Sequence, residues 1–340
     1  MTRYFVHTSG ENSSIAQAEV NTLVRLLDLK QPLWKGRIGL IDSVKDPVPF
    51  LLDRAAMVKE AGIVLATSTD IDSVLVDVSD DDLMRSVLRT DTFSVRTIPL
   101  GKKNEFSLRQ DIEIAVGAHI KKVTGAQVSL NNPRVRILIF LSEIANWVCV
   151  SKASKLRFEL RNREPGQKPF FHPSMMNASL ARVMCNLAGV MPDEVVLDPF
   201  CGGGGILCEA SLIGAKTVGI DLNWRLLRGG LKNLAAIGNN HSFIQGDVRK
   251  IPISKCDCIV TDPPYGRASS TRGAHSINLI ESLMKKIDSL LRRRDESLCI
   301  CGDIEMNIQN IAELYGLTIN KALRIRVHSG LVREVLTIGF

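Results

Sequence analysis

Short apolar runs alternate with longer amphipathic segments through the second half of the chain. This rhythm is typical of a doubly wound parallel sheet, in which each strand is followed by a helix that covers one face of the sheet. A short turn between the last two apolar runs predicts a terminal antiparallel hairpin. We expect strands at 195–200, 216–222, 242–247, 256–265, 297–303, 319–328 and 333–340, and helices at 205–214, 223–238, 275–293 and 306–315.

The first half of the chain has a less regular pattern of apolar and polar positions. Two neighbouring apolar runs, 134–141 and 146–153, predict a second hairpin. The mixture of short strands and helices favours an α+β region built on small sheets. Further strands are expected at 3–8, 63–67 and 93–101, and helices at 14–28, 48–62 and 105–123.

An acidic residue stands at the end of four successive predicted strands in the second half. These residues are Asp198, Asp221, Asp247 and Asp262. Because the carboxyl ends of parallel strands line one crevice, we expect the four carboxylates to converge on one ligand site. Each aspartate taken alone is also typical of a helix N-cap. Their recurrence at successive strand ends favours the ligand site.

The first of these acids opens a glycine-rich turn, DPFCGGGGI at 198–206. Gly202 and Gly204 let the backbone approach a ligand closely, and the N-terminus of the following helix favours a negative group. The spacing fits neither the dinucleotide-binding G-x-G-x-x-G nor the P-loop. Asp198 would repel a pyrophosphate, but it suits a cationic ligand. S-adenosylmethionine combines an ammonium, a sulfonium and a carboxylate, and is therefore the cofactor we predict.

The next two acids suit the other end of the same cofactor. Asp221 follows the next strand, the place where an acid accepts hydrogen bonds from ribose hydroxyls. Asp247 can accept a hydrogen bond from an adenine amino group, and Val248 can pack on the adenine ring.

The motif TDPPYG, at 261–266, predicts the place of the reaction. The Asp262 carboxylate and the Pro263 carbonyl can accept hydrogen bonds from an amino group conjugated to a heterocycle, which would turn its lone pair toward a methyl donor. Tyr265 offers a ring on which a planar base can stack. Because such a group is buried in a stacked helix, we expect the base to be flipped out. Alone, the motif could also be a structural bend.

Composition and charge narrow the function classes. The chain has 340 residues, enough for two or three domains, and its 45% hydrophobic and 23% charged residues are typical of a globular protein. No apolar run reaches the ~18–20 residues that cross a bilayer, and no signal segment is visible. We therefore expect no membrane association and a cytoplasmic protein.

The net charge of +7 permits a polyanionic partner. The basic stretch 152–168 could follow a phosphate backbone or be a solvated linker.

The cysteines do not have the spacing of a metal site. The pairs Cys256/Cys258 and Cys299/Cys301 have strand spacing rather than the C-x2-C spacing of a zinc knuckle. We therefore predict no metal. Buried free thiols are expected at Cys149, Cys185, Cys201, Cys208, Cys299 and Cys301.

These motifs also carry a family resemblance. DPFCGGGGILCEA, GIDLN, QGDV and TDPPYG resemble the sequential motifs of class I S-adenosylmethionine-dependent methyltransferases that modify exocyclic amino groups. The upstream segment 161–190 and the C-terminal VHSGLVREVLTIG resemble the THUMP-domain tRNA guanine N2-methyltransferases, in particular the archaeal-type tRNA (guanine(10)-N2)-dimethyltransferases. The motifs cover roughly 125–340.

The resemblance implies a domain order. A ferredoxin-like region at 1–55 and a THUMP RNA-binding domain at 56–152 would hold tRNA, a basic linker would occupy 153–170, and a Rossmann-like α/β methyltransferase domain with a C-terminal antiparallel hairpin would occupy 171–340.

The resemblance also implies roles for single residues. Asp198, Gly202 and Gly204 would line the methionine end of the cofactor, Asp221 would hold the ribose and Asp247 the adenine. Asp262, Pro263 and Tyr265 would hold guanine. Phe171 and His172 would lie near the cofactor or the base, and Arg333, in the matched C-terminal motif, would help hold RNA. Arg267 directly follows the TDPPYG motif, where it could meet a phosphate of the flipped nucleotide or be an ordinary surface arginine.

Two features depart from the family or from helix propensity. Gly203 stands where the family usually has threonine or serine, which removes a hydroxyl contact. Gly229 and Gly230 fall inside a predicted helix, at a cost of about 1 kcal/mol each, and could allow close packing.

The sequence therefore predicts a tRNA methyltransferase that transfers one or two methyl groups from S-adenosylmethionine to N2 of a guanosine, at position 10 by resemblance. Other tRNA positions or rRNA, and a non-catalytic RNA-binding protein with this fold, remain as alternatives. DPPY alone would also suit a DNA adenine methyltransferase. The sequence does not decide whether a small activating subunit of zinc-finger type is needed; of the oligomeric states, it favours a monomer.

Overall fold

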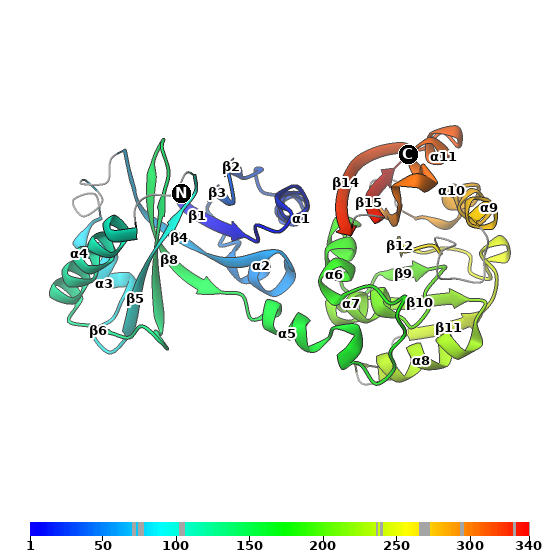
Figure 1. The fold of residues 1–340 in the computed structure, drawn as a ribbon, viewed down its shortest axis with the longest axis horizontal. Helices are drawn as coiled ribbons and strands as arrows, with labels where there is room; N and C mark the ends of the chain where they lie inside the picture. Colours follow the sequence, from blue (N-terminus) through cyan, green and yellow to red (C-terminus); the bar gives the residue numbers. More distant parts are fainter. Residues whose placement is uncertain are drawn as a thin grey trace. The chain divides into compact units, whose positions relative to one another are not determined.

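The computed structural model describes residues 1–69, 73, 78–101, 106–235, 237–238, 241–264, 273–292, 296–328 and 331–339. The chain divides into two compact units. The first comprises Met1–Ser13, Leu27–Asp53 and Val58–Lys155, and the second comprises Ser14–Leu26, Arg54–Met57 and Leu156–Phe340. Figure 1 shows the elements of each unit. In the described residues, none of the helices has the length and apolar character needed to cross a membrane.

The first unit is built on an eight-stranded sheet with the order β2-β3-β1-β4-β8-β7-β5-β6. Its strands pair antiparallel, except that β5 runs parallel to both β6 and β7. The strands are β1 (Thr2–Thr8), β2 (Leu33–Lys35), β3 (Ile38–Ser43), β4 (Val58–Ser68), β5 (Thr92–Pro99), β6 (Gln127–Val128), β7 (Val135–Leu141) and β8 (Asn146–Ala153). Its helices are α2 (Val48–Arg54), α3 (Asp80–Ser86) and α4 (Phe106–Thr124). The predicted hairpin of β7 and β8 is confirmed.

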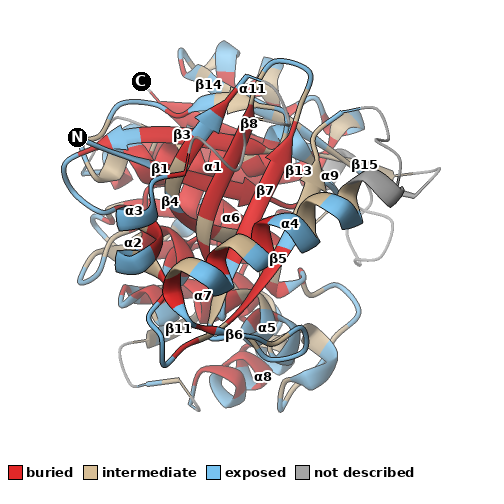
Figure 2. Cartoon of the chain, turned by 90° about the vertical axis from the view of Figure 1, so that its left-hand side faces the viewer, coloured by how far each residue is buried: buried red, intermediate tan, exposed pale blue. Residues whose placement is uncertain are grey.

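Strand β7 is buried on both faces. Ile137 and Ile139 belong to a core cluster with residues of α3 and α4, whereas Leu138 and Phe140 belong to a second cluster that includes Trp147. Figure 2 shows β7 and β8 as largely buried strands. Burial on both faces explains why the sequence of β7 is a continuous apolar run without alternation.

The helix expected over 48–62 is wrong in its second half. Helix α2 ends at Arg54, and the chain enters β4 at Val58. Strand β4 pairs with β1 on one side and with β8 on the other. This pairing overrides the local helical pattern, because sheet hydrogen bonds and burial outweigh propensity. Strands β2 and β3 also lie where the pattern predicts no element.

The second unit has a seven-stranded sheet with the order β11-β10-β9-β12-β13-β15-β14. Its strands are β9 (Val195–Asp198), β10 (Lys216–Asp221), β11 (His241–Gln245), β12 (Cys258–Thr261), β13 (Leu298–Asp303), β14 (Thr318–His328) and β15 (Leu331–Gly339). Its helices are α1 (Ser13–Leu26), α5 (Leu156–Asn162), α6 (Ala178–Leu187), α7 (Gly205–Ile213), α8 (Trp224–Ala235), α9 (Gly273–Met284), α10 (Ile287–Leu290) and α11 (Ile308–Leu314). Short 3-10 turns occur at η2 (Pro165–Gln167), η3 (Val248–Lys250) and η4 (Ile304–Met306).

This sheet confirms the predicted doubly wound fold. Strands β9 to β13 run parallel, and β15 is antiparallel to both β13 and β14. Alternate residues of each strand pack on opposite faces: Val196 and Val260 lie in a cluster with α6 and α7, and Leu197 and Ile259 lie in a cluster with α9 and α11. The six cysteines expected as buried thiols are buried and free.

A buried carboxylate joins the helices on one face of this sheet. Glu209 of α7 has no exposed surface, and it accepts hydrogen bonds from the guanidinium groups of Arg182 at 3.0 Å and Arg163 at 2.9 Å. Arg163 also lies 3.4 Å from Glu159, whose side chain is 58% exposed. The same arginine therefore has one buried and one solvated acidic partner.

Replacing Glu209 with alanine should destabilise the protein by about 3–5 kcal/mol, because Arg182 would keep a buried charge without its partner. Glu159→Ala is the matched control and should cost less than about 1 kcal/mol, since its ion pair is exposed. Urea unfolding measures both. A loss for Glu209→Ala no larger than that for Glu159→Ala would contradict the expected role of the buried pair.

The predicted domain boundaries at 55, 152 and 170 stay predictions. Residues from both of the first two ranges contribute strands to one sheet, and the chain from Leu156 onward belongs to the second unit.

Candidate active site

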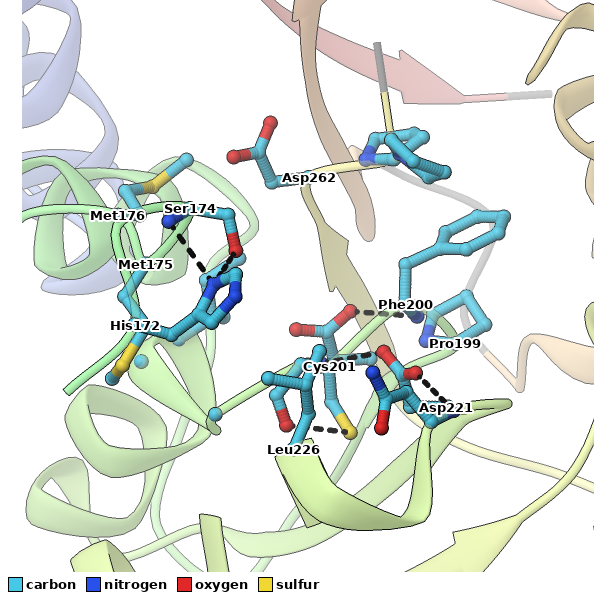
Figure 3. Close-up of a pocket in the computed structure, with 18 of the residues that line it drawn as sticks. His172, Ser174, Met175, Met176, Pro199, Phe200, Cys201, Asp221, Leu226 and Asp262 are labelled. Carbon is cyan, nitrogen blue, oxygen red and sulfur yellow. Dashed lines mark hydrogen bonds between the residues drawn. The ribbon is translucent and has the colours of Figure 1, made fainter. Parts of the chain in front are cut away.

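A pocket of about 550 Å³ lies at the carboxyl ends of the parallel strands of the second unit. This volume is typical of small-molecule sites. The pocket is lined by the four strand-end acids, Asp198, Asp221, Asp247 and Asp262. Figure 3 shows Asp221 and Asp262 toward different ends of the pocket. Among the described residues, the rest of the lining consists of His172, Pro173, Ser174, Met175, Met176, Pro199, Phe200, Cys201, Gly202, Gly203, Gly205, Ile206, Leu222, Asn223, Leu226, Gly246, Val248, Pro263, Pro264, Leu279, Asp303, Leu331 and Arg333.

The glycine turn after β9 forms one wall of the pocket. Gly202 and Gly204 have φ angles of +49° and +74°, in the left-handed region that favours glycine. Gly204 precedes the first residue of α7 and caps it. Gly202 lines the pocket, whereas Gly204 is not among the lining residues, so its predicted cofactor contact stays a prediction. The N-terminus of α7 follows directly on a turn whose backbone favours glycine, and it can hold an anionic group.

The unusual Gly203 is explained by a segment that precedes α6. A Cβ at Gly203 would lie 2.8 Å from Sδ of Met175 and 3.2 Å from the Phe170 ring. The side chain of Asn233 holds the same segment, accepting from the Phe170 N–H at 2.9 Å and donating to the carbonyls of Phe170 and Gly203 at 3.1 and 3.0 Å. Gly203 therefore makes room for this segment.

The glycine pair in α8 has a similar explanation. The Phe170 ring occupies the space that a Cβ at Gly229 would need, and a Cβ at Gly230 would lie 2.8 Å from the Phe243 ring. Close packing thus accounts for two glycines in the interior of a helix.

Asp198 has a buried carboxylate that accepts few hydrogen bonds from the described residues. It is 2% exposed, and its Oδ1 accepts from the Thr261 hydroxyl at 2.7 Å and from the Phe200 N–H at 3.1 Å. Burial raises the pKa of Asp198 to about 7, the two hydrogen bonds oppose this change, and the nearby carboxylates of Asp262 and Asp221 add to it. A cationic ligand would relieve this accumulation of negative charge.

Asp221 and Asp247 are held by local hydrogen bonds. Asp221 accepts from the N–H groups of Gly202 at 2.9 Å and Asn223 at 2.8 Å (Figure 3), and burial raises its pKa. Asp247 caps η3 by accepting from the Arg249 N–H at 2.9 Å, and the Arg249 guanidinium lowers its pKa. Each carboxylate oxygen can accept more than one hydrogen bond, so the N-cap role and a ligand contact are compatible.

Asp262 directly follows β12 and faces the pocket together with Pro263. Its Oδ1 is buried and accepts no hydrogen bond from the described residues. Burial raises the pKa of Asp262 to about 7. The charge of Arg333 and a hydrogen bond with the Cys301 thiol act in the opposite direction and lower this pKa. A buried acceptor without a partner costs free energy, which a ligand donor would recover.

The other residues predicted to contact the substrate divide into three groups. His172 and Arg333 line the pocket, and His172 Nδ1 lies 2.7 Å from the Ser174 hydroxyl (Figure 3). Phe171 is 56% exposed and is not among the pocket residues, so its predicted contact stays a prediction. Tyr265 and Arg267 lie outside the described residues.

Sequence reasoning missed several residues of the site. Met175 and Met176 line the pocket, and Phe170 and Asn233 fix the segment that carries them. Asp303, at the end of β13, was also missed. The pattern that identified the other strand-end acids could have found it, since it closes the predicted strand 297–303.

Comparison with protein families identifies the catalytic unit. Residues 165–334 match the UPF0020 family model, described as an RMKL-like methyltransferase domain. Over 337 residues the chain is 31% identical to the tRNA (guanine(10)-N2)-dimethyltransferase of Methanothermobacter thermautotrophicus, covering 97% of both chains. It is 32% identical over 257 residues to the enzyme of the same name from Methanocaldococcus jannaschii, covering 72% of this chain and 69% of the relative.

Solved structures show the same fold. TrmN from Thermus thermophilus superposes with a TM-score of 0.59 at 17% identity, covering 99% of each chain. SMU.472, in a complex with SAH, gives a TM-score of 0.56 at 15% identity, covering 100% of this chain and 99% of the other. The class I methyltransferase fold expected from the sequence is therefore confirmed.

Proposed function

Because the chain belongs to the family of the tRNA (guanine(10)-N2)-dimethyltransferases, we propose that it transfers methyl groups from S-adenosylmethionine to N2 of a guanosine in tRNA. The observation that carries this proposal is the buried Oδ1 of Asp262, to which no described residue donates a hydrogen bond, in the pocket that the other three strand-end acids line. A hydrogen-bond acceptor of this kind suits an amino group that must be oriented.

The pocket residues fit S-adenosylmethionine. The buried Asp198 suits the cofactor ammonium, and the glycine turn and the N-terminus of α7 suit its carboxylate. Asp221 suits the ribose hydroxyls, and Asp247 with Val248 suits the adenine. When bound, the cofactor would supply an electrophilic methyl group on its sulfonium.

Asp262 and Pro263 would act on the amino group of guanine. The N2 lone pair is spread into the purine ring, so N2 is a poor nucleophile. The Asp262 carboxylate and the Pro263 carbonyl would accept hydrogen bonds from the two N2 hydrogens. These bonds would direct the lone pair toward the methyl group. After N2 gains the methyl group it must lose a proton, and Asp262, with its pKa raised to about 7, is a suitable acceptor.

Several finer points belong to the same proposal. The first unit would act as ferredoxin-like and THUMP modules that hold the tRNA, and the enzyme would act as a cytoplasmic monomer. A small activating subunit of zinc-finger type would be needed only if the isolated chain binds the cofactor and tRNA without turning over. The four intact acids favour an active enzyme over a non-catalytic RNA-binding protein.

The target position is tested with transcripts that differ at one nucleotide. Wild-type protein should incorporate radiolabelled methyl groups into a tRNA with guanosine at position 10, approaching two per molecule. A transcript with adenosine at position 10 should accept less than about one-hundredth as much, since it lacks the N2 amino group at that site. Equal labelling of both transcripts would contradict position 10 and leave another guanosine as the target.

A further inference from the structure

Two further charged residues lie in the pocket with Asp262, and the proposed reaction assigns no role to them. Asp303 and Arg333 line the same pocket as Asp262 and Pro263. They lie on β13 and β15, the next two strands beyond β12 in the sheet order. Three neighbouring strands therefore bring a carboxylate, a carboxylate and a guanidinium, in that order, to one edge of the sheet.

The strand register shows that these side chains face the same side. Asp303 pairs directly with Arg333 across the antiparallel β13–β15 ladder, and directly opposed residues project to the same face. Two residues away along each strand, Cys301 and Val335 belong to one core cluster, which also contains Val260, two residues before Asp262. Because side chains alternate along a strand, this places Asp303 and Arg333 on the face that Cys301 and Val335 share. Asp262, which directly follows β12, interacts with the Cys301 thiol and the Arg333 guanidinium on that face.

Asp303 is buried, and the hydrogen bond that it accepts from the described residues does not saturate it. It is 6% exposed, and its Oδ1 accepts from the Glu305 N–H at 3.2 Å, which caps η4. A carboxylate offers about four acceptor positions, so the group can accept a further hydrogen bond from a ligand. Asp262 Oδ1, on the adjacent strand, is a second buried acceptor, and no described residue donates to it.

The order of these groups matches the Watson–Crick edge of guanine. That edge presents the N2 amino donor, the N1–H donor and the O6 acceptor in sequence. Adenine presents a C–H group, the N1 lone pair and an amino donor in the corresponding places, so a carboxylate would face a lone pair and a guanidinium would face a donor. A flipped base is recognised through this edge.

We propose that Asp303 and Arg333 select guanine: the Asp303 carboxylate accepts the N1–H and the Arg333 guanidinium donates to O6, which presents N2 to Asp262 and Pro263. This inference rests on the proposed N2-methyltransferase function, and it makes Asp303 a specificity-determining residue. The preference for guanine then comes from the second unit itself, independently of how the tRNA is held.

The test uses tRNA with 2-aminopurine at the methylated position. This base keeps the N2 amino group but has a lone pair at N1 and a hydrogen at C6. Wild-type protein should methylate guanine at least about 100-fold more efficiently than 2-aminopurine, measured as kcat/KM, because a site built for hydrogen bonds rejects an analogue that lacks them.

Asp303→Asn should reduce this preference at least tenfold. Because Asn keeps Oδ1 for the Glu305 N–H, its amide nitrogen would face N1, where it donates to 2-aminopurine and clashes with the guanine N1–H. Glu305→Gln, an exposed neighbour outside the pocket, is the matched control and should keep the wild-type ratio. Calorimetric binding of S-adenosylmethionine, expected within twofold of wild type, shows that the variant is folded.

A ratio in Asp303→Asn within threefold of the wild-type ratio would overturn the assignment, since a purely structural role would lower both activities together. Absence of guanine methylation by the wild-type protein is a different outcome, and it would overturn the proposed function on which the assignment rests.

Discussion

Replacing Asp262 with asparagine should lower the rate of methyl transfer to tRNA by about 10²- to 10⁴-fold, the range expected when a group that orients a reactant and accepts its proton is lost. Asparagine keeps the size of the side chain, but it can neither take the N2 proton nor offer a charged acceptor. Cofactor affinity should change less than threefold, because the contacts proposed for S-adenosylmethionine come from other residues. Single-turnover kinetics with saturating cofactor separate these two effects.

The pH profile of the wild-type enzyme provides an independent check on Asp262. Since burial raises the pKa of Asp262 to about 7, the carboxylate is protonated below that value and ionised above it. The rate with saturating cofactor should rise with pH up to about 7 and then level off, and Asp262→Asn should lose this dependence.

Asp257→Asn is the control for Asp262. Asp257 lies just before β12 and outside the pocket, where it accepts from the Val195 N–H at 2.8 Å, a bond that asparagine can also accept. Its rate should stay within about threefold of wild type. A normal rate in Asp262→Asn, with an unchanged pH profile, would exclude Asp262 as the orienting group.

Asp198→Asn should weaken S-adenosylmethionine binding by about 100-fold, because a buried carboxylate that pairs with the cofactor ammonium would be lost. Burial raises the pKa of Asp198 to about 7, so wild-type affinity should increase as pH rises toward 7 and be constant above it. The variant should bind weakly at every pH. Titration calorimetry between pH 5.5 and 8.5 measures both effects.

The same substitution should stabilise the protein in the absence of cofactor. The raised pKa means that the folded state disfavours the Asp198 carboxylate, so the cost is full above about pH 7 and disappears below the usual aspartate value of 3.8. Asp198→Asn should therefore gain on the order of 1–3 kcal/mol at pH 8 and nothing at pH 3.5. Asp193→Asn, an exposed residue before β9, should change neither binding nor stability. A variant that binds the cofactor as tightly as wild type would contradict the role of Asp198.

The sequence predicts the second unit well because its pattern is local. Each of β9, β10 and β12 is a short apolar run that ends at or next to an acid, and the geometry of a parallel sheet requires these ends to meet. The positions of Asp198, Asp221 and Asp262 in one pocket follow from that rule without any knowledge of side-chain contacts.

Contacts between distant segments were not predictable in this way. Gly229 tolerates a helix interior because the Phe170 ring fills the space beside it, and these residues lie in separate elements. Strand β4 begins at Val58 because β1 and β8 pair with it on both sides, which no local pattern records. The role proposed for Asp303 depends on its pairing with Arg333, and Arg333 belongs to a strand that follows later in the chain.

The proposed N2-methylation of guanosine in tRNA through Asp262 is tested by analysing the nucleosides of the product tRNA. Unmodified tRNA is incubated with S-adenosylmethionine and either wild-type protein or Asp262→Asn, digested to nucleosides and analysed by mass spectrometry. We expect N2-methylguanosine and N2,N2-dimethylguanosine from the wild-type reaction and a much smaller amount of both from the variant. A methyl group on another nucleoside, or equal products from both proteins, would contradict the claim.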